Sequence, residues 1–201
     1  TTEIYTLSLH DALPILLSHR SGIGELPKKS DLFKAPGFGM NIKWPNPIPP
    51  LSTLHDTDIT PEVMPGTKYA YGNFGFSLLG YLIEVISGMD YVEYIRKNIL
   101  DPLEMSHSDF LRSERVRDFE AVGYAVKGKS YKTATYWQGI IKPAGMLYSN
   151  VEDMAKFAQM LLIGGVYNER KIIEKATLEE CWTPQYSTHE RFKNSHAVGL
   201  A

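Results

Sequence analysis

One stretch of the sequence decides the fold: Pro65-Gly66-Thr67-Lys68-Tyr69-Ala70-Tyr71-Gly72-Asn73-Phe74-Gly75-Phe76-Ser77-Leu78-Leu79-Gly80. Its second half begins the clearest helical pattern of the chain, which predicts a helix from Phe74 to Ser87. Apolar residues recur there at steps of three and four positions, the spacing of one buried helix face, namely Phe76, Leu79, Ile83 and Ile86. Asn73 is predicted as the N-cap of this helix and Gly88 as the glycine that ends it.

Two further elements are expected directly after this helix. A second helix should begin with Asp90 as its cap and end at Asp101-Pro102, because proline blocks continuation of the preceding helix. Its predicted apolar face consists of Tyr91, Tyr94, Ile95 and Ile99. Residues 121–135 alternate loosely around Lys127-Gly128-Lys129-Ser130, which predicts a β-hairpin.

The C-terminal third of the chain predicts two more helices. Ser149-Asn150-Val151-Glu152 is interpreted as a capping box that starts a helix ending at Gly164-Gly165. The apolar side of that helix is predicted to hold Met154, Phe157, Ala158, Leu161 and Leu162. A last short helix is expected over residues 174–181.

The N-terminal third contains few regular elements. Residues 16–23 are expected to be the end of a helix running into a loop, with Gly22 suited to a positive φ. Residues 24–66 are rich in proline and glycine. Their segment Trp44-Pro45-Asn46-Pro47-Ile48-Pro49-Pro50 excludes helix interior and central strand, so a long loop is predicted.

The composition is that of an ordinary globular domain and excludes several classes of function. Of the 201 residues, 43% are hydrophobic and 22% are charged, and the formal net charge is −2. Without a basic patch, nucleic acid is not an expected partner. No apolar run approaches the ~20 residues that span a bilayer. A single cysteine, Cys181, excludes an intrachain disulfide.

Both ends of the sequence suggest that a longer coding sequence was cut. Residues 1–15, TTEIYTLSLHDALPI, resemble the translation of a common sequencing adaptor and are interpreted as a non-native segment. The native part is then expected to be residues 16–201, a partial domain that continues upstream of Leu16. The apolar run at residues 195–201 stops without a turn or a polar tail, so the domain is expected to be truncated there as well.

Five ordered segments resemble the β-lactamase-related serine hydrolases, a family that includes class C β-lactamases, D-Ala-D-Ala carboxypeptidases and esterases. The most specific one is Tyr71-Gly72-Asn73, which is similar to the Tyr-x-Asn motif of that family. The others are residues 16–23 (Leu-Leu-Ser-His-x-Ser-Gly), 83–105, 143–162 (Pro-Ala-Gly, then Ser-x-x-Glu-Asp-Met) and 176–185 (ending Trp-Thr-Pro-Gln). Together they cover nearly all of residues 16–200.

The resemblance implies roles for Tyr71 and Asn73. A phenol with a pKa of ~10 is a poor base at neutral pH, but neighbouring cations lower that pKa and let it activate a serine. Tyr71 would be this general base, and Asn73 would bind the amide carbonyl of the substrate. Gly72 fills the middle position, which the family often gives to serine. Without the family, a packing tyrosine and a plain helix cap remain the alternatives for these two residues.

Two other motifs of the family are absent from the sequence. None of its serines is followed three positions later by lysine, so the Ser-x-x-Lys nucleophile pair is missing. No Lys-Thr-Gly or His-x-Gly strand is found, and Lys132-Thr133-Ala134 is interpreted as part of the hairpin. Ser77 lies inside the predicted helix and is rejected as a nucleophile.

Other polar and aromatic clusters have simpler interpretations than a catalytic site. His19 is expected to be structural, tying its loop to neighbouring backbone. The segment His55-Asp56-Thr57-Asp58 is interpreted as a solvated loop rather than a metal site, since zinc needs three or four convergent ligands. Residues 131–137, rich in tyrosine and tryptophan, are expected to pack within the hairpin, with the wall of a substrate cleft as the alternative.

The resemblance therefore implies an α+β fold, mainly the helical lobe of a β-lactamase/DD-peptidase-like domain. The parent protein would hydrolyse an amide or ester bond of a small-molecule or peptide substrate through an acyl-serine, with no metal and no organic cofactor. The 201-residue chain itself is expected to be inactive. The alternatives are a non-catalytic binding protein on the same scaffold and an unrelated helical interaction domain. Localisation and oligomeric state stay open, although the family is often exported.

Overall fold

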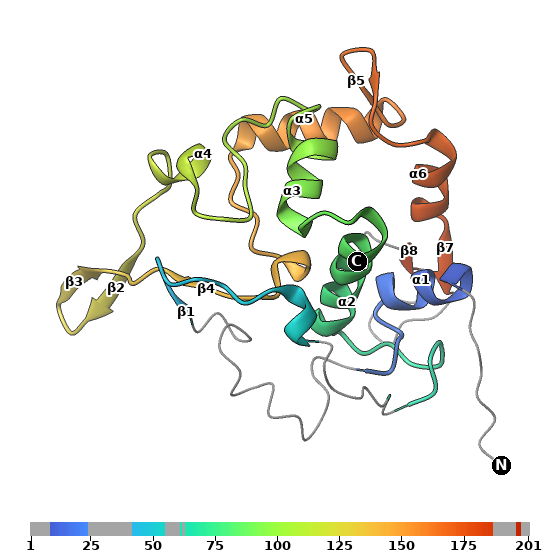
Figure 1. Cartoon of the computed structure of the whole chain (residues 1–201), viewed down its shortest axis with the longest axis horizontal. Helices are drawn as coiled ribbons and strands as arrows, with labels where there is room; N and C mark the ends of the chain where they lie inside the picture. Colours follow the sequence, from blue (N-terminus) through green and yellow to red (C-terminus); the bar gives the residue numbers. More distant parts are fainter. Residues whose placement is uncertain (1–8, 24–41, 55–60, 62, 187–195, 198–201) are drawn as a thin grey trace.

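The computed structural model describes residues 9–23, 42–54, 61, 63–186 and 196–197 (Figure 1). Longer helices alternate with short strands, which confirms the predicted mixed α+β fold. The helical segments are α1 (Leu9–Leu17), η2 (Leu51–Leu54), α2 (Asn73–Ser87), α3 (Tyr91–Ile95), η3 (Arg96–Leu100), α4 (Glu114–Arg117), η4 (Lys142–Ala144), α5 (Val151–Leu162) and α6 (Lys175–Trp182). None of the helices in the described ranges is long and apolar enough to cross a membrane.

The described strands form four separate antiparallel pairs rather than one extended sheet. β1 pairs with β4, β2 with β3, β5 with β6, and β7 with β8. Their bounds are β1 (Ile42–Lys43), β2 (Tyr124–Lys127), β3 (Ser130–Thr133), β4 (Trp137–Gln138), β5 (Val166–Tyr167), β6 (Arg170–Lys171), β7 (Pro184–Tyr186) and β8 (His196–Ala197). The helices therefore carry the packing of the described part, as predicted for a helical lobe.

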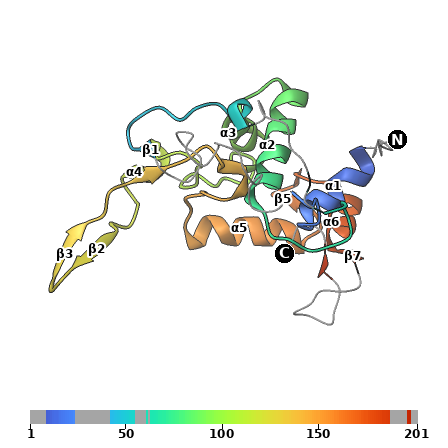
Figure 2. The same ribbon diagram turned by 90° about the horizontal axis from the view of Figure 1, so that it is seen from below.

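The hairpin of β2 and β3 confirms the sequence prediction for residues 121–135. Its two strands pair from Tyr124 with Thr133 to Lys127 with Ser130, and Gly128 in the turn has a φ of 65°. All eight strand residues are exposed. Figures 1 and 2 show the hairpin as an arm that projects from the body in both views.

The start of α2 corrects the predicted helix cap. The N-cap is Gly72, in an extended conformation and without a side-chain cap, whereas Asn73 is the first helical residue. The side chain of Asn73 instead accepts a hydrogen bond from the Tyr71 hydroxyl. At the other end, Gly88 adopts a left-handed conformation with φ 68° and its N–H donates to the Glu84 carbonyl, as predicted.

The buried face of α2 also differs from the predicted one. Its buried residues are Phe74, Gly75, Ser77 and Gly80, whereas Ile86 is 71% exposed. The reason is close packing: a Cβ added at Gly80 would lie 2.1 Å from Pro143 Cγ of η4. Small residues let the side chains of Pro143 and Leu16 approach this side of the helix. Of the predicted face, Ile83 still packs against the core, so the apolar pattern is correct only in part.

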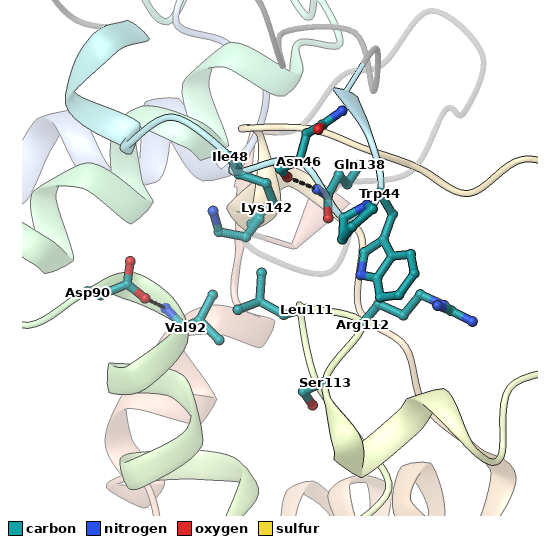
Figure 3. Close-up of a pocket in the computed structure, with 11 residues that line it drawn as sticks. Trp44, Asn46, Ile48, Asp90, Val92, Leu111, Arg112, Ser113, Gln138 and Lys142 are labelled. Carbon is teal, nitrogen blue, oxygen red and sulfur yellow. Dashed lines mark hydrogen bonds between the residues drawn. The ribbon is translucent and has the colours of Figure 1, made fainter.

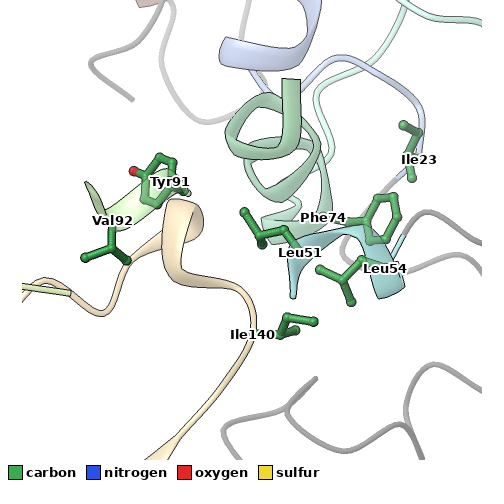
Figure 4. Close-up of a cluster of buried hydrophobic side chains, with 7 residues drawn as sticks. All are labelled: Ile23, Leu51, Leu54, Phe74, Tyr91, Val92 and Ile140. Carbon is green, nitrogen blue, oxygen red and sulfur yellow. The ribbon is translucent and has the colours of Figure 1, made fainter. Parts of the chain in front are cut away.

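A first apolar cluster gathers around α2 and joins segments that are far apart in the sequence (Figure 4). The α2 residue Phe74 is completely buried. The other buried members come from the loop after α1, η2, α3 and the strand region before η4, namely Ile23, Leu51, Leu54, Tyr91, Val92 and Ile140. This cluster fixes the segments on both sides of Tyr71.

A second apolar cluster lies between α3–η3, α5 and the β5–β6 hairpin. Its buried members are Leu100, Leu103, Met105, Met160 and Tyr167. The α3 helix starts as predicted, because the Asp90 carboxylate accepts hydrogen bonds from the backbone N–H groups of Val92 and Glu93. Ile95 packs against both clusters and so connects them.

The cap of α5 differs from its prediction, and its apolar side differs in part: of the predicted residues, Phe157 and Leu161 pack against the second cluster. Asn150, not Ser149, is the N-cap, and its Oδ1 accepts from the Asp153 N–H at 2.8 Å. The buried residues of the helix are Asp153 and Met160, whereas Met154 is 42% and Leu162 is 86% exposed. Ala158 is exposed as well. The buried Asp153 carboxylate accepts from the His107 N–H and the Ser108 hydroxyl, and these bonds turn this side of the helix inward.

The remaining predictions concern the two ends and the long loop. The last helix, α6, forms one residue later than the predicted 174–181. α1 ends at Leu17 as expected, and it begins at Leu9, so it runs across the boundary predicted at Leu16. The separate origin of residues 1–15 stays a prediction. Residues 24–41 of the predicted loop and the segment His55-Asp56-Thr57-Asp58 lie outside the described residues.

Candidate active site

Tyr71 lies in a loop that is fastened to the end of α1. The Ala70 N–H donates to the His19 carbonyl at 2.8 Å, and the Gly66 N–H donates to the Arg20 carbonyl at 2.8 Å. These backbone bonds join the two segments just before α2 begins. The position of Tyr71 is therefore set by residues about fifty positions earlier in the chain, as well as by the helix that follows it.

The structure brings the two predicted site residues together. The Tyr71 hydroxyl donates to Asn73 Oδ1 at 3.0 Å, and the Tyr71 side chain is 54% exposed. The phenol is therefore open to solvent rather than sealed in the apolar cluster around Phe74. Asn73 is half-buried at the first turn of α2, where its amide nitrogen takes no part in the bond to Tyr71.

His19 supports the ring of Tyr71 by direct packing. Their ring centroids are 4.5 Å apart, and Phe76 packs on His19 with a centroid distance of 5.0 Å. His19 Nδ1 accepts a hydrogen bond from the Gly72 N–H at 3.2 Å. A backbone N–H can only donate to an unprotonated ring nitrogen. This confirms the structural role predicted for His19, which ties its loop to the backbone of the Tyr-x-Asn segment.

Burial favours the neutral form of His19. The residue is 6% exposed, and desolvation holds the pKa of its imidazole below the ordinary value. Its backbone has a φ of 56°, a left-handed conformation that histidine adopts more often than most residues other than glycine. This turn and the burial of the ring direct the His19 imidazole toward the backbone N–H of Gly72.

Within the described part of the chain, the surroundings of Tyr71 contain no cation bonded to the phenol. Its side chain forms the hydrogen bond to Asn73 and the ring contact with His19. Ser77 is completely buried and its hydroxyl donates to the Asn73 carbonyl at 3.2 Å, so it does not act as a nucleophile. The described residues also contain no group of histidine, cysteine and carboxylate side chains that could hold a metal ion.

The aromatic segment 131–137 does not pack as a unit. Tyr131 is 73% exposed on the hairpin, which contradicts packing within it. Tyr136 and Trp44 instead enclose the Arg112 guanidinium, whose central carbon is 4.2 Å and 4.4 Å from the two ring centroids. Trp44 and Arg112 also line a cavity that the sequence did not predict, because its walls come from several separate segments.

Known proteins resemble this chain over nearly its whole length. The sequence profile of the beta-lactamase family matches residues 13–199. The protein PbpX of Bacillus subtilis (strain 168), a putative penicillin-binding protein by name, is 27% identical over 185 residues, which cover 90% of this chain and 45% of PbpX. The chain thus spans less than half the length of this curated relative.

Solved structures give the same result for the fold. The octameric penicillin-binding protein homologue from Pyrococcus abyssi is 28% identical, with a TM-score of 0.63 over 92% of this chain and 42% of that one. The D-amino acid amidase from Ochrobactrum anthropi SV3 is 22% identical, with a TM-score of 0.62 over 87% of this chain and 48% of that one. Since the profile match takes in the Tyr-x-Asn segment and nearly every described element, the chain belongs to the beta-lactamase family.

Proposed function

We propose that this chain carries part of the active site of a serine hydrolase that cleaves amide or ester bonds through an acyl-serine. Tyr71 would act as the general base and Asn73 would bind the substrate. The observation that carries the proposal is the exposed Tyr71 hydroxyl in a 3.0 Å hydrogen bond with Asn73 Oδ1. Membership of the beta-lactamase family supports the same assignment.

The hydrogen bond between Tyr71 and Asn73 suggests a separate catalytic role for each residue. Because Asn73 Oδ1 accepts from the Tyr71 hydroxyl, the amide nitrogen of Asn73 is left to donate to a substrate carbonyl. The Tyr71 oxygen, in turn, would accept the proton of an attacking serine once a neighbouring cation lowers the pKa of the phenol. The serine oxygen then forms the ester bond to the acyl group, and the proton passes to the leaving amine or alcohol.

The substrate class follows from the relatives by analogy. One structural neighbour is named as a D-amino acid amidase and others as penicillin-binding proteins. Both names refer to ligands with an amide carbonyl, which is the group that an asparagine amide can hold. We therefore propose a small-molecule or peptide substrate with an amide, β-lactam or ester carbonyl, and no metal or organic cofactor.

The 201-residue chain is proposed to be inactive on its own. None of its serines has a lysine three positions later, and the acyl-serine step needs such a pair on one helical turn. We expect no hydrolysis of a chromogenic cephalosporin or a p-nitrophenyl ester above the rate of buffer. Robust turnover by this chain, lost in Ser77→Ala or any other single serine variant, would overturn the assignment of the missing nucleophile.

The role of Tyr71 is tested in the product of the complete gene. A fluorescent penicillin should acylate that protein, and Tyr71→Phe should slow acylation by about 100-fold or more, the usual contribution of a general base. Tyr131→Phe, on the exposed strand β3, is the matched control and should leave the rate unchanged. Equal acylation rates for Tyr71→Phe and the parent protein would remove Tyr71 from the mechanism.

A second candidate, a non-catalytic binding protein on the same scaffold, is favoured by the missing Ser-x-x-Lys pair alone. The sequence of the complete gene distinguishes the two. A Ser-x-x-Lys pair in it supports the hydrolase, and its absence supports the binding protein.

A further inference from the structure

A cavity of about 410 Å³ opens beside the start of α3, where Asp90 and Val92 line it (Figure 3). Its volume lies within the range of small-molecule sites. Apolar side chains from three segments, Ile48, Val92 and Leu111, form part of its wall. Figure 3 shows Val92 and Leu111 between Lys142 on one side and Ser113 on the other. The cavity thus combines an apolar surface with a lysine.

Lys142 is an unusual residue for such a wall because it is buried without a partner. Only 6% of the residue is exposed, and within the described part of the chain its ammonium forms no hydrogen bond and no ion pair. η4 places it there by packing against α2, where Gly80 lets Pro143 approach. An ammonium group that is partly desolvated and has no direct ion-pair partner can form a charge-assisted hydrogen bond with an anion that reaches it.

The other charged groups around the cavity already have partners. The Arg112 Nε lies 2.5 Å from Glu120 Oε2, and two aromatic rings enclose its guanidinium. The Asp90 carboxylate accepts two backbone N–H groups at the start of α3. Glu84 accepts from the Tyr91 N–H at 2.9 Å. Lys142 is therefore the cation near this cavity that has no direct hydrogen bond or ion pair among the described residues.

Burial also lowers the pKa of Lys142, while the negative charges of Asp90 and Glu84 oppose that shift. These two carboxylates lie close enough to act on the ammonium but not close enough to form ion pairs with it. Their field works against any ligand with two negative charges. It opposes a ligand with one negative charge less strongly, and the attraction of the Lys142 ammonium offsets that repulsion only when the charge lies beside it.

We propose that this cavity binds a small organic monocarboxylate. The carboxylate would accept a hydrogen bond from the Lys142 ammonium, and a short apolar body would lie against Ile48, Val92 and Leu111. The site is separate from the proposed hydrolytic site: Tyr71 precedes the first residue of α2, whereas Glu84 and Asp90 lie at its far end. The proposal therefore does not depend on the hydrolase assignment.

Titration calorimetry with butyrate as the probe tests the site on the 201-residue chain. Butyrate should bind saturably, 1-butanol should not, and the dianion succinate should bind more weakly than butyrate. Lys142→Met keeps the length and apolar stem of the side chain and should weaken butyrate binding by about tenfold or more, which corresponds to roughly 1.4 kcal/mol. Lys175→Met, at an exposed lysine of α6, is the matched control and should bind as the parent does.

A second variant should change butyrate binding in the opposite direction. Asp90→Asn keeps a side-chain cap for α3 but removes one negative charge near Lys142, so butyrate should bind more tightly. Unfolding followed by circular dichroism verifies that each variant is folded. The proposal is overturned if butyrate gives no saturable heat with the folded parent chain, or if Lys142→Met binds it as tightly as the parent.

Discussion

His19 links two segments that are 53 positions apart in the sequence. Its ring packs on Tyr71, its Nδ1 accepts from the Gly72 N–H, and its carbonyl accepts from the Ala70 N–H. A single neutral imidazole therefore supports both the ring and the backbone of the Tyr-x-Asn segment. The geometry between Tyr71 and Asn73 should depend on the protonation state of this buried histidine.

The stability of the chain should fall in mildly acidic solution because of His19. The pKa of the folded imidazole lies below its ordinary value of 6.5, so the unfolded chain binds the proton more readily. The stabilising contribution is complete above about pH 6.5 and is lost as the pH falls toward the lowered pKa. Urea unfolding at several pH values between about 7.5 and 5 measures this slope.

His19→Gln supplies the control, since glutamine keeps a hydrogen-bond acceptor but does not titrate. We expect the variant to be less stable at neutral pH and to show a shallower loss of stability between about pH 6.5 and 5 than the parent chain. An identical pH slope in the parent and the variant would show that His19 does not contribute to it.

Among the elements, α2 is the helix on which η4 and α1 pack most closely at glycine positions. Gly80 faces the Pro143 ring of η4, and Gly75 faces Leu16 of α1, where a Cβ added to the glycine would lie 3.4 Å from Leu16 Cδ2. The glycines lower the intrinsic helix propensity of this segment, yet they allow two other elements to pack against it. The close approach at Gly80 also brings Lys142 to the wall of its cavity.

Gly80→Ala should destabilise the chain even though alanine is the better helix former. The new methyl group would overlap the rigid Pro143 ring, at a cost of about 1–3 kcal/mol, against a gain in helix propensity of at most about 1 kcal/mol. Gly123→Ala is a matched control, because its Cβ would meet only the Ala134 Cβ at an ordinary 3.5 Å. Denaturant unfolding of both variants checks the difference, and equal stabilities would refute the packing argument.

Across the whole molecule, the two apolar clusters meet at Ile95. This residue packs against the cluster around Phe74 and also against the cluster around Leu103. The adjacent Arg96 donates to both oxygens of the buried Asp109 carboxylate, which adds a second, polar link at the same place. The described part of the chain should therefore unfold as one cooperative unit.

Ile95→Ala tests that cooperativity. We expect a loss of about 2 kcal/mol, in the lower range for truncation of an aliphatic side chain in an apolar cluster. In the parent chain, tryptophan fluorescence and far-ultraviolet circular dichroism should report the same midpoint of urea unfolding. Separate midpoints in the parent would mean that the clusters unfold independently. Ile86→Ala, at a position that is 71% exposed, is the control and should change stability little.

Local sequence signals predict the helices and the hairpin of this chain better than they predict the contacts between these elements. The helix after Tyr71, its terminal Gly88, the Asp90 cap and the hairpin turn are predictable because each depends on a few neighbouring residues. The proximity of Tyr71 and Asn73 follows from a spacing of two residues, so it is predictable as well. Their catalytic roles rest on the resemblance to the family and stay predictions.

The errors arise where distant segments decide the outcome. The inward face of α5 contains Asp153, whose partners His107 and Ser108 lie 46 and 45 positions away. Apolar periodicity therefore finds Phe157 and Leu161 on that face but misses its buried carboxylate. The cavity at Lys142 escapes prediction for the same reason. The position of Lys142 directly after the apolar pair Ile140-Ile141 does not reveal its burial, because lysine is mostly exposed in proteins.

The projecting arm of β2 and β3 is a site where the chain can be cut or modified. Its strand residues bury nothing against the body, so its tip, Gly128-Lys129, is a natural place for a protease to cut or for a peptide tag to be spliced in. Among the described residues, brief exposure to trypsin should nick the chain first after Lys127 or Lys129, leaving two pieces that stay associated through the apolar clusters. A tag attached at this tip would mark the molecule without touching either candidate site.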